Sequence, residues 1–390
     1  MDKYYCKNYN KWNKRVLAHF GLHNAVGANK HIAVNSNAGD TSLFSAVMEL
    51  FDYSFGCNKW ILSSLWNEIN QKEVDYLNSE ADAIVLGGGG LLLRDQKGAD
   101  SANSGWQWNC PVDMLSKFKV PIIIFAIGYN RFRDQPEFDP IFSEHITELV
   151  RISDFFSLRN SGSIRAVGKY LLDESLKSKL ILQPCPTTVI WHIYEDMIKK
   201  FHTPKVQKNM AINIAFDRRD MRFDQDEDKI MADISRVIKK YNDSGWNIVL
   251  ANHKPQDNEF SRWLDKEGVR YKAVDLSQYR PEEIIKFYSD KRLTVGMRGH
   301  SQMIPFGLRK NILSIVSHDK LKWFLEDIDH PEWGVDVREN DFKNKFDEKI
   351  QEIGGDRHEE INQELISAQE KIWNLTQENM KKISQIIIKL

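Results

Sequence analysis

The sequence predicts an α/β protein built from two tandem Rossmann-like domains that face a cleft, with a C-terminal helix after them. Short apolar runs alternate with amphipathic stretches along most of the 390 residues, a pattern typical of parallel sheets covered by helices on both faces. The alternation stops at residues 183–208, where prolines and a basic stretch replace it. A chain of this length also exceeds what one compact core normally holds.

The predicted N-terminal domain, residues 1–190, contains four apolar runs that we expect to be strands, at 31–35, 81–86, 121–127 and 154–159. The first run leads into a polar loop at 36–40. The helix expected after that loop has apolar residues on one face, namely Leu43, Val47, Leu50 and Phe51. The fourth run precedes a helix that begins at Asn160 or Ser161.

The predicted C-terminal domain, residues 205–345, repeats the pattern, with strands expected at 210–216, 246–251, 271–274, 293–295 and 311–316. Pro281 marks the start of a helix, because proline fits the first helical turn. We interpret residues 183–208, between the two domains, as a linker.

The tail, residues 355–390, is expected to be helical. Its apolar stripe consists of Trp373, Thr376, Met380, Ile383, Ile387 and Leu390. Such a stripe is compatible with a coiled coil or with contact to a membrane surface, but a helix packed back on the body of the protein is the favoured interpretation.

The composition argues against several classes of function. A formal net charge of -1, without a long basic stripe, gives no electrostatic case for binding nucleic acid. The longest apolar stretch, near residues 122–127, is far shorter than the roughly 20 residues of a membrane span. Peripheral membrane contact is therefore the only membrane association left open.

Cysteine usage indicates a reducing compartment. The four cysteines are widely spaced and form no CxxC pair: Cys6, Cys57, Cys110 and Cys185. We expect free thiols rather than a disulfide framework or a zinc ribbon. Because the N-terminus also lacks the apolar core of a signal peptide, we expect a cytoplasmic protein.

The most informative site candidate is Arg298-Gly299-His300, which follows the apolar run 293–295. Open α/β sheets bind ligands at the carboxyl ends of their strands. Arginine pairs with carboxylate or phosphate, and histidine exchanges protons near neutral pH. The alternative is an ordinary surface arginine beside a core histidine.

Other expected strand ends also carry polar residues. Arg159 precedes a helix start and suits an anion, although, taken alone, a salt bridge on the rim is the favoured explanation. Asp40 lies where it could act in a site or simply cap a helix. The run Gly87–Gly90 fits neither G-x-G-x-x-G nor a P-loop, and it allows close approach of a ligand or of a neighbouring helix. Residues 217–220 and 317–320 could also face the cleft.

Taken in order, these segments resemble the polysaccharide pyruvyl transferase family over roughly residues 30–330. The resemblance rests on Asn-x-Gly-Asp at 37–40, the glycines at 87–90, Pro-Ile-Ile-Ile-Phe-Ala-Ile-Gly at 121–128, Ser-Leu-Arg-Asn-Ser-Gly-Ser at 157–163, Gly-Met-Arg-Gly-His-Ser at 296–301, and Val-Ser-His-Asp-Lys at 316–320 followed by Trp323 and Phe324. Each motif is weak alone, and their common order is specific.

The resemblance implies a GT-B-like architecture and a defined reaction. Pyruvate would pass from phosphoenolpyruvate onto two hydroxyls of a sugar in a polysaccharide or glycan precursor, forming a cyclic ketal and releasing phosphate. The acceptor would be a sugar or a lipid-linked oligosaccharide. Phosphoenolpyruvate is then the donor substrate, and we expect no cofactor and no metal.

The resemblance also assigns residues to roles. Those implied to hold phosphoenolpyruvate are Arg159, Arg298, Gly299, His300, Ser301 and Lys320. The acceptor is expected near Asn37, Gly88, Gly89 and Gly90. Arg298 would neutralise the departing phosphate, His300 would act as acid or phosphate ligand, and Asp40 as base. Gly299 stands where many members of the family carry Leu, so only a backbone contact is retained there.

Two alternatives use the same expected fold. A GT-B glycosyltransferase would bind a nucleotide-sugar with arginine and lysine at its diphosphate. A non-catalytic member would bind only a glycan or a partner protein, which the intact arginine and histidine positions argue against.

Overall fold

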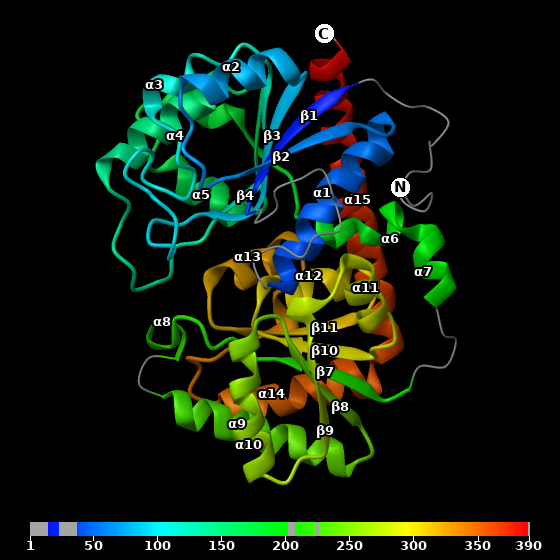
Figure 1. Ribbon diagram of the computed structural model, residues 1–390. Helices are drawn as coiled ribbons and strands as arrows, with labels where there is room; N and C mark the ends of the chain where they lie inside the picture. The colour runs from blue at the N-terminus through cyan, green and yellow to red at the C-terminus, as the bar shows by residue number, and fades with distance from the viewer. Residues whose placement is uncertain (1–14, 23–36, 202–206, 224–225, 389–390) are drawn as a thin grey trace.

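The computed structural model of the chain describes residues 15–22, 37–201, 207–223 and 226–388. Within these ranges two six-stranded sheets, each parallel throughout, form the two ends of the molecule in Figure 1. We call residues 15–182 the N-terminal half and residues 207–356 the C-terminal half. The chain therefore forms two Rossmann-like units in tandem, as the sequence predicts.

The first sheet has the strand order β2-β1-β3-β4-β5-β6. Its strands are β1 Val16–Gly21, β2 Lys59–Ser64, β3 Ala83–Leu92, β4 Ile122–Tyr129, β5 Phe155–Leu158 and β6 Leu180–Leu182. β3, β4 and β5 confirm three predicted strands, whereas β1, β2 and β6 were not predicted. The strand expected at 31–35 lies outside the described residues.

The helices of the N-terminal half cover this sheet. They are α1 Ala38–Phe55, α2 Gln71–Glu80, α3 Val112–Leu115, α4 Pro140–Ile152 and α5 Ser161–Gly168. The side chain of Asn37 caps α1 by accepting a hydrogen bond from the backbone N–H of Gly39, at 3.0 Å. Asn160 caps α5 in the same way, as expected for these residue types. Because Asn37 is the cap, Asp40 in the first turn of α1 is not needed for that task.

The second sheet has the order β12-β11-β10-β7-β8-β9. Its strands are β7 Asn209–Asn213, β8 Asn247–Asn252, β9 Tyr271–Asp275, β10 Leu293–Gly296, β11 Asn311–Val316 and β12 Gly334–Asp336. Five of the six match predicted strands, and β12 was not predicted. The associated helices are α8 Arg219–Phe223, α9 Glu227–Asp243, α10 Ser261–Lys266, α11 Pro281–Ser289, α12 Gly299–Gly307, α13 Asp319–Asp327 and α14 Phe342–Ile350.

The expected linker at residues 183–208 is largely helical over its described part up to residue 201, which corrects the interpretation of Pro186, whereas Pro204 lies outside the described residues. It contains a 3-10 helix, Pro186–Val189, then α6 Ile190–Ile193 and α7 Glu195–Phe201. All four residues of the 3-10 helix are buried. Pro186 starts this helix instead of breaking one, since proline suits a first helical position.

The C-terminal helix α15, His358–Ile388, lies along both halves (Figure 1). Its buried face includes Trp373, Met380 and Ile383, which confirms that the predicted stripe packs on the body of the protein. Asn379 donates to the carbonyl of Leu182 at 2.8 Å, and Gln369 donates to the carbonyl of Gly307 at 2.7 Å. The helix is thus bonded to the N-terminal half and to the C-terminal half.

The expectation of free thiols holds for two of the cysteines but not for Cys57. Cys110 and Cys185 are free and buried, but Cys57 is disulfide-bonded, with its partner outside the described residues. In the ranges that the structure describes, we find no helix with the length and apolarity required to traverse a bilayer.

We expect Gly307→Ala to destabilise the protein although alanine normally favours helices over glycine. A Cβ at this buried position would lie 2.0 Å from the carbonyl oxygen of Thr187, so α12 and the 3-10 helix would have to separate. The free energy of unfolding in urea should fall by about 1–3 kcal/mol. Gly355→Ala is the control, because nothing lies within 4 Å of its added Cβ. Equal stability of the two variants would contradict this packing argument.

Candidate functional site

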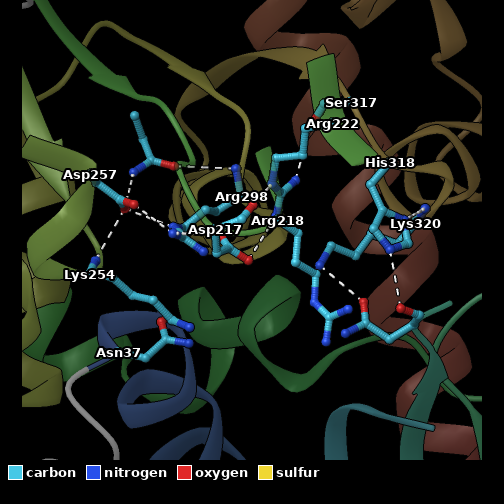
Figure 2. A network of polar contacts seen from close by, with 12 residues as sticks. Asn37, Asp217, Arg218, Arg222, Lys254, Asp257, Arg298, Ser317, His318 and Lys320 are labelled. Atoms are coloured by element: carbon cyan, nitrogen blue, oxygen red, sulfur yellow. Dashed lines mark hydrogen bonds and ion pairs between the residues drawn. The ribbon is translucent and has the colours of Figure 1, made fainter. Parts of the chain in front are cut away.

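The carboxyl ends of the two sheets approach each other and enclose a cavity of about 130 Å³. Both halves contribute to it, and a backbone hydrogen bond from Ala38 N–H to the carbonyl of His253, 3.0 Å long, joins them at its edge. The cavity is lined by six cationic side chains, Arg159, Arg218, Arg222, Lys254, Arg298 and Lys320, and by two carboxylates, Asp40 and Asp217. Figure 2 shows most of this network.

Arg298 is held rigidly at the end of β10, where it precedes α12. Its Nε and Nη2 donate to the two carboxylate oxygens of Asp257 at 2.7 and 2.6 Å, and Nη2 also lies 2.7 Å from Asp217 (Figure 2). Burial lowers the pKa of the guanidinium, but the two carboxylates raise this pKa by more than burial lowers it. The pKa of Arg298 is therefore raised overall. Because the bonds to Asp257 and Asp217 use Nε and Nη2, the nitrogen of Arg298 that remains available to a ligand is Nη1.

Asp257 is the residue that fixes this geometry. It is 0% exposed, and it accepts from Asn213 at 3.1 Å and from the backbone N–H groups of His253 and Lys254 as well as from Arg298. A buried carboxylate that accepts this many bonds is well satisfied. Asp257 lies in the 3-10 helix Pro255–Phe260, so the turn after β8 sets the position of an arginine after β10.

Asp217 and Arg222 form the second part of the network. Arg222 is fully buried and donates to Asp217 at 3.2 Å and to Ser317 at 3.0 Å. Burial raises the pKa of Asp217, but Arg222 and Arg298 outweigh it and hold that pKa well below its usual range. Asp217 is therefore ionised, and it offsets part of the positive charge of the cavity.

Arg159 brings a buried guanidinium into the cavity from the residue after β5. It is 7% exposed, and neither its Nε nor its Nη2 has a hydrogen-bond partner among the described residues. Two glycines provide the space around it: a Cβ at Gly128 would lie 2.1 Å from Nε, and one at Gly90 would lie 3.1 Å from Nη2. Buried polar groups are nearly always satisfied, so this guanidinium is a candidate partner for an anionic ligand.

Lys320 enters the cavity from the first turn of α13. Its Nζ donates to the side-chain oxygen of Asn130, 3.2 Å away in the N-terminal half. His318 caps α13 by accepting from the backbone N–H of Lys320 at 3.1 Å. Burial, followed by the charges of Arg222 and Arg159, places the pKa of Lys320 well below its usual value. An anion bound next to Lys320 would raise this pKa again and favour the protonated, positively charged form of the side chain.

His300 lies in the first turn of α12 and packs over the backbone of α1. A Cβ at Gly39 would lie 2.6 Å from its Nδ1, while its Nε2 is 3.6 Å from the sulfur of Cys185. Burial and the charge of Arg159 hold the pKa of His300 well below its usual value. The imidazole is therefore neutral at pH 7.

Asp40 faces the same cavity from the first turn of α1. The side-chain amide of Asn37 donates to its Oδ2 at 2.7 Å. Burial raises the pKa of this carboxyl group, against the opposing effects of Lys254 and Asn37. A carboxyl group with a raised pKa beside arginines is suited to proton transfer.

The structure brings most of the sequence-predicted residues together. Those that line the cavity are Asn37, Asp40, Gly90, Arg159, Arg298, Gly299, His300 and Lys320. A Cβ at Gly299 would meet Lys320 at an ordinary 3.8 Å, so this position has room for a side chain.

Three predicted residues lie outside the lining. Gly88 and Gly89 pack against Leu43 of α1. A Cβ added at Gly88 would lie 3.3 Å from one methyl group of Leu43, and a Cβ added at Gly89 would lie 3.1 Å from the other. Ser301 is fully buried, and its hydroxyl donates to the carbonyl of Arg298 at 2.8 Å. These residues shape the backbone around the cavity.

Sequence reasoning did not identify Lys254, Asp257 or Asn130 as site residues. Lys254 follows β8, and in Figure 2 its side chain extends toward Asn37. The sequence feature that could have identified them is their position, because each of these residues comes shortly after an expected strand. In the described ranges no three His, Cys, Asp or Glu side chains are grouped so that they could hold a metal ion.

Comparison with known proteins identifies the family of the chain. The sequence model of the family described as polysaccharide pyruvyl transferase matches residues 7–319. The chain belongs to this family. Among curated proteins, no sequence matches it significantly.

Solved structures share the GT-B-like fold of this pyruvyl transferase family member. A glycosyltransferase from Rickettsia africae ESF-5 has a TM-score of 0.53 at 10% identity, covering 96% of this chain and 99% of its own. The UDP-GlcNAc 2-epimerase from Neisseria meningitidis, bound to UDP-GlcNAc, has a TM-score of 0.51 at 12% identity, covering 96% and 100%. At such identities the similarity establishes the fold alone.

We expect Arg159→Met to stabilise the ligand-free protein while abolishing its stabilisation by inorganic phosphate. The substitution removes a buried, unsatisfied guanidinium, which costs about 1–3 kcal/mol, and it also removes an anion ligand. Thermal melting with and without phosphate measures both effects. Arg165→Met, at a more exposed position of α5, is the control that should keep the phosphate response. A phosphate response retained in Arg159→Met would contradict this role.

We expect stability to fall as the pH decreases below about 6.5, the pKa of an unfolded histidine. Burial holds the folded-state pKa of His318 and His300 well below that value and that of His253 at about 3, so the unfolded chain binds more protons. Urea unfolding at pH 7 and pH 5 measures the loss. His318→Asn keeps a helix cap without the titrating ring, and should reduce the pH dependence by up to about 1.4 kcal/mol per pH unit. Unchanged pH dependence in this variant would refute the assignment.

Proposed function

We propose that the protein transfers pyruvate from phosphoenolpyruvate onto two hydroxyls of a sugar, forming a cyclic ketal and releasing inorganic phosphate. The observation that carries this proposal is the buried, unpaired guanidinium of Arg159 in a cation-lined cavity that also contains the carboxyl group of Asp40. Membership of the polysaccharide pyruvyl transferase family supports the same reaction class.

The charges of the cavity suit a small compound with two anionic groups. Phosphoenolpyruvate carries a carboxylate and a phosphate, and guanidinium groups bind both with charge-assisted hydrogen bonds. Arg298 is fixed by Asp257 before any ligand arrives, so its remaining nitrogen is preorganised for an anion. Arg159 and Lys320 offer two further cations from separate strand ends. Such fixed cations stabilise negative charge that develops on departing phosphate.

The proton steps are assigned to Asp40 and His300. Asp40 accepts the proton of an attacking sugar hydroxyl, and its raised pKa makes it a stronger base than an ordinary aspartate. His300 is neutral without ligand, but a phosphate dianion beside it favours the imidazolium, which then donates to a phosphate oxygen or to the methylene carbon.

The atoms balance without a further co-reactant. The methylene carbon of phosphoenolpyruvate gains a proton, C2 forms bonds to two sugar oxygens, and the bond from C2 to the phosphate oxygen breaks. The two hydroxyl protons leave the sugar, one to the new methyl group and one to the phosphate.

The size of the cavity favours this donor over a nucleotide-sugar. Its volume of about 130 Å³ is well below the roughly 300–1,000 Å³ of sites for drug-sized ligands. A three-carbon phosphate ester matches this space better than a nucleoside diphosphate with an attached sugar.

The test is release of phosphate from phosphoenolpyruvate with a panel of galactose, mannose and N-acetylmannosamine glycosides. We expect release that depends on both substrates, and Asp40→Asn should lower kcat by about 10²–10⁴-fold while phosphoenolpyruvate still raises Tm. Asp75→Asn, which changes an exposed carboxylate on α2, should behave as the unaltered protein. Stabilisation by UDP and not by phosphoenolpyruvate would overturn the proposal.

A further inference from the structure

A second cavity, of about 420 Å³, lies between the two halves next to the cationic one. The two cavities use neighbouring residues of the same two segments, the loop after β4 and the first turn of α13. Asn130 and Lys320 line the cationic cavity, Arg131 and Asp319 line the second, and Phe132 lines both. The two spaces are therefore separated by little more than one layer of side chains.

Aromatic rings form much of the second cavity. Trp323 of α13 packs directly on α5, because a Cβ at Gly162 would lie 1.9 Å from the indole. Tyr129 and Tyr170 also line it, with their hydroxyls 3.1 Å apart. Trp323 and Tyr170 are only partly buried, so their rings present apolar surface to a wet space, as is common in binding sites.

Apart from Lys169 at the exposed rim, the charged side chains of this second cavity form ion pairs. Arg133 donates to Asp319 at 2.7 Å and to Asp336 at 2.9 Å, and Arg131 lies 3.0 Å from Glu137. These groups keep lone pairs and N–H groups available for the hydroxyls of a ligand. Together with Lys169, three cations balance three carboxylates here. An uncharged ring with apolar C–H faces and a rim of hydroxyls matches this combination.

We propose that the second cavity binds the acceptor glycan, as a subsite for the sugar unit adjoining the one that reacts. The inference rests on the proposed function, because the cavity of about 130 Å³ has no room for a hexose beside phosphoenolpyruvate. The acceptor therefore needs adjoining space, and Trp323 and Tyr170 supply stacking surfaces there. This subsite would make the protein prefer an oligosaccharide over a single sugar.

The test measures glycan binding to the full-length protein by calorimetry, with inorganic phosphate filling the cationic cavity. The probes are methyl glycosides and trisaccharides of galactose, mannose and N-acetylmannosamine. We expect at least one trisaccharide to bind more tightly than its methyl glycoside, and Trp323→Ala or Tyr170→Ala to weaken it by about tenfold or more. Lys169→Ala, at an exposed position of the rim, should weaken it about threefold even if the aromatic variants fail to fold. Tyr76→Ala, 46% exposed on α2, is the matched control.

The outcomes separate this inference from the proposed function. Trisaccharide binding that survives in the folded variants of the second cavity, or no binding by any probe, overturns the subsite. The rise in Tm caused by phosphoenolpyruvate is measured on the same proteins and should persist in all of them. Its absence from the unaltered protein contradicts the proposed donor and leaves the glycan result as independent evidence for a binding site.

Discussion

Repulsion between cations that are withdrawn from water is the constraint around which the site is organised. Two unit charges 4 Å apart interact by about 4 kcal/mol at the effective dielectric of a protein surface, and six cationic side chains line one small cavity. Asp257 and Asp217 offset part of this repulsion by binding Arg298 and Arg222. The remaining imbalance distinguishes this cavity from a structural ion-pair cluster, and an anion entering the cavity would reduce it.

The same charges join the two halves of the molecule. Arg218 of the C-terminal half forms a bidentate pair with Asp95 of the N-terminal half, at 2.7 and 2.8 Å, and the interior of the cavity combines strand ends from both sheets. Neither half contains Arg159, Asp40 and Arg298 together. Docking of the halves and assembly of the site are therefore one event, and a substitution at the contact surface affects binding as well as stability.

The sequence predicted what depends on long apolar runs and their immediate neighbours. β4 is a continuous apolar strand, and Ser314 alone interrupts the apolar run Ile312–Val316 of β11. β1 was missed because the buried His19, which is bonded to the distant carbonyl of Gly87, breaks its apolar run. Arg298 was identified because it ends a strand. Asp257 was not, since its function consists entirely of bonds to residues distant along the chain.

Helix α15 has a consequence for how the protein is made. The N-terminal half ends at Leu182, yet the carbonyl of that residue is satisfied by Asn379, 197 residues further along the chain. A growing chain on the ribosome can form the first sheet early, but the side of that half which α15 covers stays open to water until α15 itself has emerged. Nascent chains that have not yet reached α15 therefore expose apolar surface, which makes them prone to aggregation.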